Sequence, residues 1–538
     1  MLYPLKSSVA GARSRHAMVA ACFFIGALLL LLPVLAVLAS LFAGTGQTQA
    51  HIWSTNGVQW LLGTMGLCAI VAVLAGTLGV VTAGLVSLTD LPARRWISAA
   101  LALPFAVPAY ILAYVISDVT GPFGFIAMLG GGDVAAFLSS MLRTQFGAAC
   151  VLSLTVYPYV FLAVRADFLS RSGAYVEAGA MLGRSRIAIF TTILVPAARA
   201  AFLGGLALAL METAADFGVS DYLGIQTLST GIFRTWYGFG DLLAASQIAG
   251  GLFIVAALFL VLEEASRAGQ RSEHVRAHRA APLFALSRGS KFLGVLICAV
   301  PVLLGFVVPV LVLTSMVIET ASLARFTLPM TIFGNTVLVA GIGAFLAMCL
   351  AGGLAIANRW VRSKFFAVAT RLITIGYAIP GGVIAVGILL AGQKLLAPIG
   401  ITVTSGGLFV LIYAYIVRFL TAGYNNVHGG FSQINPLVDA AARTLGAGIW
   451  RTGARIHLPM TRMAFAAGAM IVFVDIVREL PATLLLRPFN FETLATQVYR
   501  LASDERLAQA APACLLLILT GLVPVILISL FSDCKSAA

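Results

Sequence analysis

Residues 177–199 read EAGAMLGRSRIAIFTTILVPAAR, and residues 440–462 read AAARTLGAGIWRTGARIHLPMTR. Each stretch contains a short helical pattern, a glycine that ends it, an amphipathic piece, and a proline that precedes a long apolar run. The glycine and the proline are thirteen residues apart in both copies: Gly183 and Pro196, then Gly446 and Pro459. A loop of this kind presents a rigid knob, and its duplication indicates an internal repeat.

The repeat extends beyond these two loops. At the same offset of 263 residues, Glu212 and Asp216 of the first half are matched by Asp475 and Glu479 of the second. An even number of apolar runs in each half predicts two lobes that run in parallel and are related by an axis along the membrane normal.

The composition excludes a soluble globular protein. The chain is 60% hydrophobic and 10% charged, with a mean hydropathy of +1.00, so a soluble fold would expose apolar surface to water. A net charge of +14 would suggest nucleic acid as a partner of a soluble protein, but here it is explained by membrane topology. The seven cysteines are scattered and predict neither a disulfide framework nor a zinc site.

Uncharged apolar runs of about 20 residues predict membrane-spanning helices. Twelve are found, near residues 18–43, 58–88, 96–117, 145–164, 193–215, 242–262, 292–317, 332–357, 367–391, 405–424, 461–480 and 508–531. Most basic residues then fall on one side, in the tails and in the loops Arg94–Arg95, Arg165–Arg199, Arg267–Lys291, Arg359–Arg371 and Arg418–Arg462. By the positive-inside rule, both termini are expected in the cytoplasm of a cell with an inner membrane.

One long polar stretch, residues 263–291, lies midway along the chain and is typical of a linker. The expected organisation is a first six-helix lobe over residues 1–262, a cytoplasmic linker over 263–291, and a second six-helix lobe over 292–538. Glu273, His274 and His278 of the linker could face one way and bind a metal, although a solvated connector is favoured.

The duplicated loops resemble the EAA loops of ABC importer permeases, the coupling helices that dock into a groove of the ATPase subunit. The first copy keeps Glu177, Ala178, Gly183 and Pro196. The second keeps Gly446 and Pro459 but has Ala440 where the glutamate belongs, with Asp439 one position earlier. The resemblance implies an all-α polytopic fold of the type I importer permease, about twelve helices in two lobes, with two ATPase copies and a periplasmic binding protein as partners.

The chain has no Gly-Lys dipeptide, and therefore no loop of the kind that cradles ATP phosphates. It also lacks a recognisable catalytic constellation. The expectation is a transport subunit, not an enzyme, without a cofactor of its own, whose partner ATPase uses ATP and Mg²⁺. The other transport class considered is a secondary transporter with twelve spans in parallel halves, but that class gives no reason for duplicated Gly-to-Pro loops.

Residues 479–496, ELPATLLLRPFNFETLAT, are similar to the ferric-iron permeases among these importers, although permeases for thiamine, polyamines and phosphonates share part of the pattern. The residues give an independent argument, because carboxylates near the end of a spanning helix usually face a polar cavity or a partner. The four that repeat would suit a hard cation such as Fe³⁺: Glu212, Asp216, Asp475 and Glu479.

Three alternatives remain open at this stage. The carboxylates could instead pair with Arg478 or neighbouring backbone, or form gate contacts. Tyr110 and Tyr114 share a helix face and could add oxygen donors or serve as interfacial anchors. Pro104, Pro108 and Pro380 predict either interrupted helices that line a cavity or simple kinks.

Overall fold

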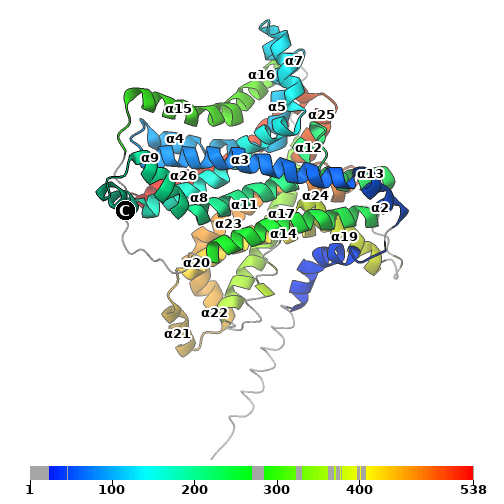
Figure 1. Cartoon of the computed structure of the whole chain (residues 1–538). Coiled ribbons are helices and arrows are strands. Elements are labelled where there is room, and N and C mark those ends of the chain that lie inside the picture. Colours follow the sequence, from blue (N-terminus) through cyan, green and yellow to red (C-terminus); the bar gives the residue numbers. More distant parts are fainter. Residues whose placement is uncertain are drawn as a thin grey trace, which may run out of the picture.

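The structure is a computed structural model that describes residues 24–44, 46–268, 284–322, 330–360, 369–370, 373, 376, 379–396, 400 and 407–536. Helices make up most of these residues (Figure 1). A helix satisfies its backbone hydrogen bonds internally, which a bilayer core requires. Residues 269–283 of the predicted linker, with Glu273, His274 and His278, lie outside the described residues.

The helices follow one another in two series. The first comprises Phe24–Ser40, α2 (Gln47–Ile52), η1 (Trp53–Gly57), α3 (Val58–Leu88), α4 (Arg94–Ala100), η2 (Leu103–Ala106), α5 (Ala109–Thr120), α6 (Phe125–Met128), α7 (Gly132–Leu142), α8 (Gln145–Met181), α9 (Arg186–Ile189), η3 (Phe190–Leu194), α10 (Val195–Ala197), α11 (Arg199–Ala215), α12 (Gly218–Tyr222), α13 (Leu228–Phe239) and α14 (Leu242–Ala268). The second comprises α15 (Arg288–Val302), η4 (Leu303–Val307), α16 (Val308–Ser322), α17 (Met330–Trp360), α19 (Gly381–Leu396), α20 (Leu408–Ser432), α21 (Pro436–Thr444), α22 (Ile449–Thr452), η7 (Gly453–His457), α23 (Leu458–Arg478), α24 (Pro481–Leu486), α25 (Leu494–Ser503) and α26 (Leu507–Ser536).

By length and composition, eight helical segments of the described residues can cross a bilayer: Gln47–Leu88, Ala109–Met128, Gln145–Leu169, Leu242–Ala265, Arg288–Thr320, Met330–Trp360, Leu408–Ser432 and Gly453–Arg478. A ninth span results if Arg186–Ala197 and Arg199–Ala215, bent by 67°, are taken together. The other predicted spans overlap three shorter apolar helices, Phe24–Ser40, Gly381–Leu396 and Leu507–Val523. The prediction of an all-α polytopic membrane protein is confirmed.

The third predicted span is interrupted. Helix α4 ends at Ala100, the 3₁₀ turn η2 follows, and α5 begins directly after Pro108. Proline fixes φ and has no N–H to donate, so Pro104 and Pro108 cannot continue a regular helix. Of the two alternatives that the sequence left open at these prolines, the structure shows an interrupted helix, and α19 likewise begins only after Pro380.

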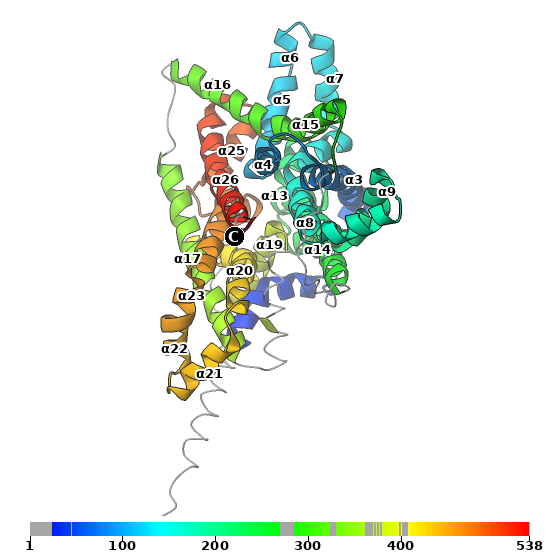
Figure 2. The same cartoon turned by 90° about the vertical axis from the view of Figure 1, so that its left-hand side faces the viewer.

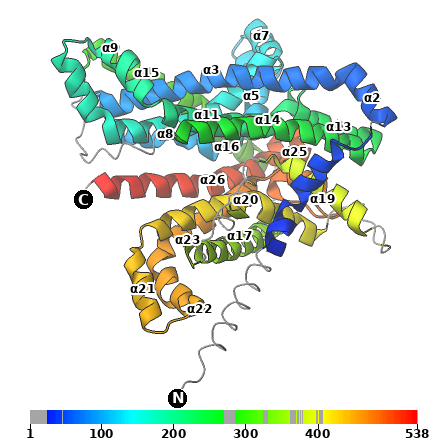
Figure 3. The ribbon, with the colours of Figure 1, turned by 60° about the horizontal axis from the view of Figure 1, so that its bottom comes forward.

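The two halves repeat the same fine structure. The π-helical turns η3 and η7 precede Pro196 and Pro459 at equivalent positions. Helices α13 and α25 both begin with a threonine capping box. In both halves, the first N–H of that helix donates to a threonine hydroxyl of a long span at 2.8 Å: Leu228 to Thr64 and Leu494 to Thr336. One loop helix of each half, α9 and α21, lies toward the left-hand side of the molecule in Figure 3, and the two are well separated from each other.

Helices of the first series also pack against helices of the second series. Phe24–Ser40 belongs to the first series, yet the Tyr413 hydroxyl of α20 donates to its Leu29 carbonyl, and a Cβ atom at Gly387 of α19 would collide with its Pro33 carbonyl. Helix α16 of the second series packs against α5 as well as α26 (Figure 2). The close contact at Gly387 requires a residue without a side chain.

Candidate translocation cavity and coupling loops

The four predicted carboxylates stand where two spanning helices end. Helix α11 ends at Ala215, and Asp216 leaves the helical conformation with ψ 127°. Helix α23 ends at Arg478, and Glu479 does the same with ψ 116°. Both then cap the short helix that follows: Asp216 accepts from the Ser220 N–H at 3.0 Å, and Glu479 accepts from the Ala482 N–H at 3.0 Å.

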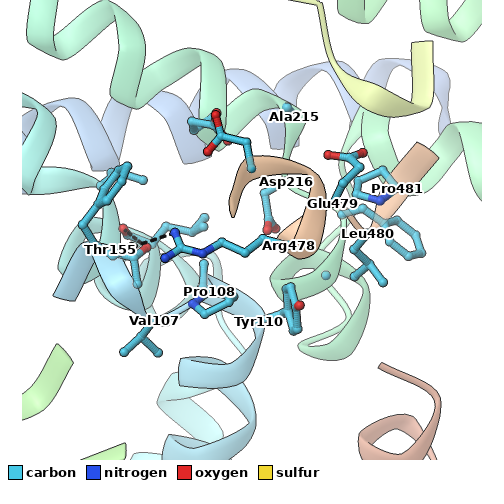
Figure 4. A pocket seen from close by; sticks show the side chains of 18 of the residues that line it. Val107, Pro108, Tyr110, Thr155, Ala215, Asp216, Arg478, Glu479, Leu480 and Pro481 are labelled. Atoms are coloured by element: carbon cyan, nitrogen blue, oxygen red, sulfur yellow. Dashed lines mark hydrogen bonds between the residues drawn. The ribbon is translucent and has the colours of Figure 1, made fainter. Parts of the chain in front are cut away.

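A cavity of about 180 Å³ lies between the two halves at these helix ends. Glu212, Asp216, Asp475 and Glu479 all line it. Figure 4 shows Asp216 and Glu479 at this pocket, with Tyr110 and Pro108 on its other side. The structure thus brings together all four carboxylates that the sequence singled out, and the interrupted third span lines the cavity through the segment from Phe105 to Tyr110.

Two arginines share the cavity with the carboxylates. The Arg418 guanidinium forms an ion pair with Glu479 at 2.6 Å, and both side chains are buried. Arg478 donates to the carbonyls of Phe105 and Ala106 at 3.0 and 3.1 Å, across the boundary between the halves (Figure 4). The cavity therefore contains groups of both signs.

The position of Arg418 corrects the sequence analysis, which assigned it to a cytoplasmic loop. It lies within α20 and is 9% exposed. The charge count treated Arg418 as the start of a loop because it stands near the end of the apolar run. A signal was present: an arginine within an apolar helical run usually faces a carboxylate of another span, and Glu479 was already a candidate.

Of the open alternatives for the carboxylates, the contact with neighbouring backbone is found for Glu479, whose Oε1 atom accepts from the Ala482 N–H, while its charged partner is Arg418. In contrast, the Asp475 Oδ2 atom is buried and has no hydrogen-bond partner among the described residues. Within the same residues, no group of three or more His, Cys, Asp and Glu side chains is arranged to hold a metal ion. The cavity is therefore lined by carboxylates but is not a preformed metal cage.

Tyr110 and Tyr114 are not interfacial anchors. They are 6% and 0% exposed, and their hydroxyl oxygens have no partner among the described residues. Tyr110 lines the cavity, whereas Tyr114 packs edge-on against Tyr222 with ring centroids 4.5 Å apart. Of the two, Tyr110 is the one placed to contact a molecule in the cavity.

Both predicted loop glycines adopt the left-handed conformation. Gly183 has φ +68° and Gly446 has φ +73°, a region in which side chains are strained. The residue after each glycine closes the turn with a backbone hydrogen bond. The Arg184 N–H donates to the Gly179 carbonyl, and the Ala447 N–H donates to the Ala442 carbonyl. Next to these turns, large apolar side chains are left exposed: Met181 by 89%, Leu182 by 77% and Leu445 by 86%.

The remaining predicted loop residues differ in their setting. Glu177 and Ala178 are exposed at the end of α8. Pro196 lies in α10, just before the 67° bend into α11, while Pro459 lies in the first turn of α23, within the single candidate span Gly453–Arg478. Asp439 is 6% exposed and pairs with Arg359 and His457, so its carboxylate points into the protein.

Residues 75–263 match the family model described as a binding-protein-dependent transport system inner membrane component. This range contains the first Gly-to-Pro loop, residues 177–199, and the end of α11 with Glu212 and Asp216. The chain is similar to the membrane permeases of binding-protein-dependent ABC transport systems, and its apolar helices fit a multi-pass protein of the inner membrane.

Similarity to known permeases extends over nearly the whole chain. The Fe(3+)-transport system permease protein FbpB 2 of Haemophilus influenzae is 24% identical over 509 residues, which cover 94% of this chain and 96% of that protein. The putative ferric transport system permease protein FbpB 1 of the same organism is 23% identical over 428 residues, 74% of this chain and 65% of that protein. The sulfate transport system permease protein CysT of Salmonella typhimurium is 26% identical over 245 residues, 44% of this chain and 85% of that protein. The resemblance to importer permeases and to ferric permeases is confirmed.

Proposed function

We propose that this permease imports ferric iron, which a periplasmic binding protein delivers, through the cavity between its halves. The single observation that carries the proposal is the convergence of Glu212, Asp216, Asp475 and Glu479 on one cavity. Carboxylate oxygens are hard donors, which suit a small, highly charged cation. The ferric relative that aligns over 94% of the chain supports the same substrate.

The charges around the cavity favour a cation over an anion. Glu479 is neutralised by Arg418, and Arg478 is engaged by two backbone carbonyls. The two terminal nitrogens of Arg478 are thus not presented as an open fork for an oxyanion, and Nη1 of Arg418 is held by the carboxylate. Asp475 retains a buried oxygen without a partner, which a passing cation would satisfy. The absence of a preformed cage in the described residues suits a path, because an ion must also leave.

Sulfate is the second candidate substrate, because a sulfate permease aligns with 44% of the chain. An oxyanion that binds Nη1 of Arg418 or the terminal nitrogens of Arg478 would have to displace the Glu479 carboxylate or the Phe105 and Ala106 carbonyls. Either exchange leaves a buried polar group unpaired, which is costly. Iron is therefore the preferred assignment, and the experiment below separates the two.

The energy source in this proposal is a separate ATPase that uses ATP and Mg²⁺. The exposed apolar side chains Met181, Leu182 and Leu445 on the two coupling loops offer docking surface for two copies of that subunit. Docking of the ATPase would put both loops in the cytoplasm, the side on which the positive-inside rule places both termini. Movement of the loops would then change the packing of the halves around the cavity.

The test uses proteoliposomes that contain the chain, its ATPase and its binding protein loaded with ferric iron or with sulfate. We expect ferric loading alone to stimulate ATP hydrolysis and uptake. Asp475→Asn should reduce iron uptake by about tenfold or more, while the control Asp504→Asn, which removes an exposed carboxylate at the end of α25, leaves it within about twofold.

Each other outcome contradicts part of the proposal. Stimulation by the sulfate-loaded protein alone would remove iron as the substrate. Iron uptake that does not need the ATPase would identify a secondary transporter. Equal uptake by wild type and Asp475→Asn would exclude the cavity as the path.

A further inference from the structure

The second coupling loop is attached to the bundle by a network centred on Asp439. The Arg359 Nε atom, at the end of α17, donates to Asp439 Oδ2 at 2.6 Å. His457 Nε2, in the π turn η7, lies 2.7 Å from Asp439 Oδ1. One carboxylate thus joins the loop helix α21 to two elements that lead into the membrane, α17 and α23.

Arg359 also stabilises a break in the chain. Helix α20 ends at Ser432 and α21 begins at Pro436, so carbonyls near the break lose their helical partners. The other two nitrogens of the Arg359 guanidinium donate to the carbonyls of Phe431 and Ile434 at 2.6 and 2.9 Å. The planar fork of arginine suits such a multiple contact. Arg359 therefore fixes the angle at which α21 leaves α20.

His457 is fully buried beside this carboxylate. Its ring packs edge-on against Phe431, with ring centroids 5.1 Å apart. Its Nδ1 atom has no hydrogen-bond partner among the described residues. The histidine is therefore held by Asp439 on one side and by an aromatic ring on the other, and its only polar contact there is the carboxylate.

The first half has buried apolar residues at the equivalent positions. At the offset of 263 residues, Val176 stands for Asp439 and Leu194 stands for His457, and both are 2% exposed. At the 272-residue offset that relates Thr64 to Thr336, Ser87 stands for Arg359. In that half the helix is not broken, because α8 runs without interruption to Met181.

We propose that Asp439, Arg359 and His457 are positioning residues that transmit movement between the second coupling loop and the spans α17 and α23. The inference rests on the coupling role given to this loop under the proposed function. It assigns the two loops different attachments, one made of charged and polar groups and one made of apolar packing. The acidic residue nearest the second EAA position then acts inward on its own subunit instead of outward on the ATPase.

The physics of buried charges provides a clean test. Removing one member of a buried charged network leaves its partners unpaired, whereas replacing the whole network by apolar groups is often tolerated. Asp439→Val should leave Arg359 and His457 without their carboxylate partner. The triple variant R359Q/D439V/H457L places the apolar residues of the first half at positions 439 and 457 and keeps an amide donor for the carbonyls of Phe431 and Ile434, so it should restore an apolar attachment.

The first readout is the number of substrate molecules transported per ATP hydrolysed by the full complex. We expect Asp439→Val to lower this ratio about fivefold or more, the triple variant to return it to within about twofold of wild type, and Asp504→Val to leave it unchanged. A purely structural role would lower protein yield but not the ratio. A normal ratio in the properly folded single variant would overturn the proposal.

The second readout does not depend on the substrate, so it separates this inference from the proposed function. Amide hydrogen exchange is measured for residues 436–448 and 177–185 in the purified chain. Asp439→Val should speed exchange in the second loop about tenfold and leave the first loop unchanged. Equal protection of the second loop in variant and wild type would also overturn the proposal, and if Asp439→Val does not fold, His457→Asn is measured in its place.

Discussion

The Arg418 guanidinium lies 2.6 Å from the Glu479 carboxylate in the interior of the bundle, where the two side chains are 11% and 4% exposed. An ion pair in such a place contributes little net stability when intact, since desolvation of both ions opposes their attraction. Removing one partner of the pair is strongly destabilising, because the other charge is then left buried without a counterion.

We therefore predict that Glu479→Gln, which leaves Arg418 unpaired, lowers the free energy of unfolding by about 3 kcal/mol or more. The measurement is thermal unfolding of the purified protein in detergent. The matched control is Arg500→Gln, which breaks the more exposed pair with Glu492 at 2.9 Å and should cost about 0–1 kcal/mol. Similar losses in both variants would contradict the burial argument.

The second prediction concerns the two left-handed glycines. Gly183→Ala and Gly446→Ala place a side chain at φ +68° and +73°, and each should destabilise its turn by about 1 kcal/mol. We expect ATPase stimulation by the loaded binding protein to fall in both variants, because the loop geometry changes. Gly353→Ala serves as control: it is exposed within α17, and an added Cβ meets nothing within 4 Å. Normal stimulation in both loop variants would show that the turn geometry is dispensable.

The third prediction concerns pH. Burial raises the pKa of Asp439, but the hydrogen bonds from His457 and Arg359 outweigh it and hold the pKa below its usual value. The stabilisation gained from a lowered carboxyl pKa is complete above the unfolded value, about 3.9, and is lost as the pH falls through the folded value. The difference in melting temperature between wild type and Asp439→Asn should thus be constant near neutral pH and shrink below about pH 4. A difference that persists unchanged in acid would contradict the assignment.

The fourth prediction tests the repeat itself. The hydroxyls of Thr64 and Thr336 accept equivalent N–H groups from Leu228 and Leu494, both at 2.8 Å and both buried. Thr64→Val and Thr336→Val should each cost about 1–3 kcal/mol, because a buried donor loses its partner. The double variant should show additive losses in unfolding experiments, since the sites lie in different halves. The exposed helical Thr77→Val is the control and should be nearly neutral. Markedly unequal losses would mean that the two contacts are not equivalent.

Much of the fold was predictable because its signals are local. Apolar runs placed the spanning helices, the Gly-to-Pro spacing placed both loops, and the constant offset brought four carboxylates together before any geometry was known. These features depend on hydropathy and on backbone restrictions of single residues, which the sequence states directly.

The partners of the charged residues were not predictable in the same way. Arg418 was assigned to a loop, and Asp439 was grouped with the second EAA-like loop as the acidic residue nearest the missing glutamate, because both assignments used distance along the chain. The direction of each side chain depends on a residue far away: Glu479 for Arg418 and Arg359 for Asp439. Tertiary packing sets such pairings, and they cannot be predicted from hydropathy or from local residue spacing.

The packing of Phe24–Ser40 against helices of the second half has a consequence for biogenesis. The helix Phe24–Ser40 leaves the ribosome early, but its contacts at Tyr413 and Gly387 are made by α20 and α19, which are synthesised much later. The contacts of Phe24–Ser40 with α19 and α20 can therefore form only after the second half has been inserted into the bilayer. The helices can enter the bilayer one after another, but the packing between the two halves is completed late, and it involves a helix that was synthesised early.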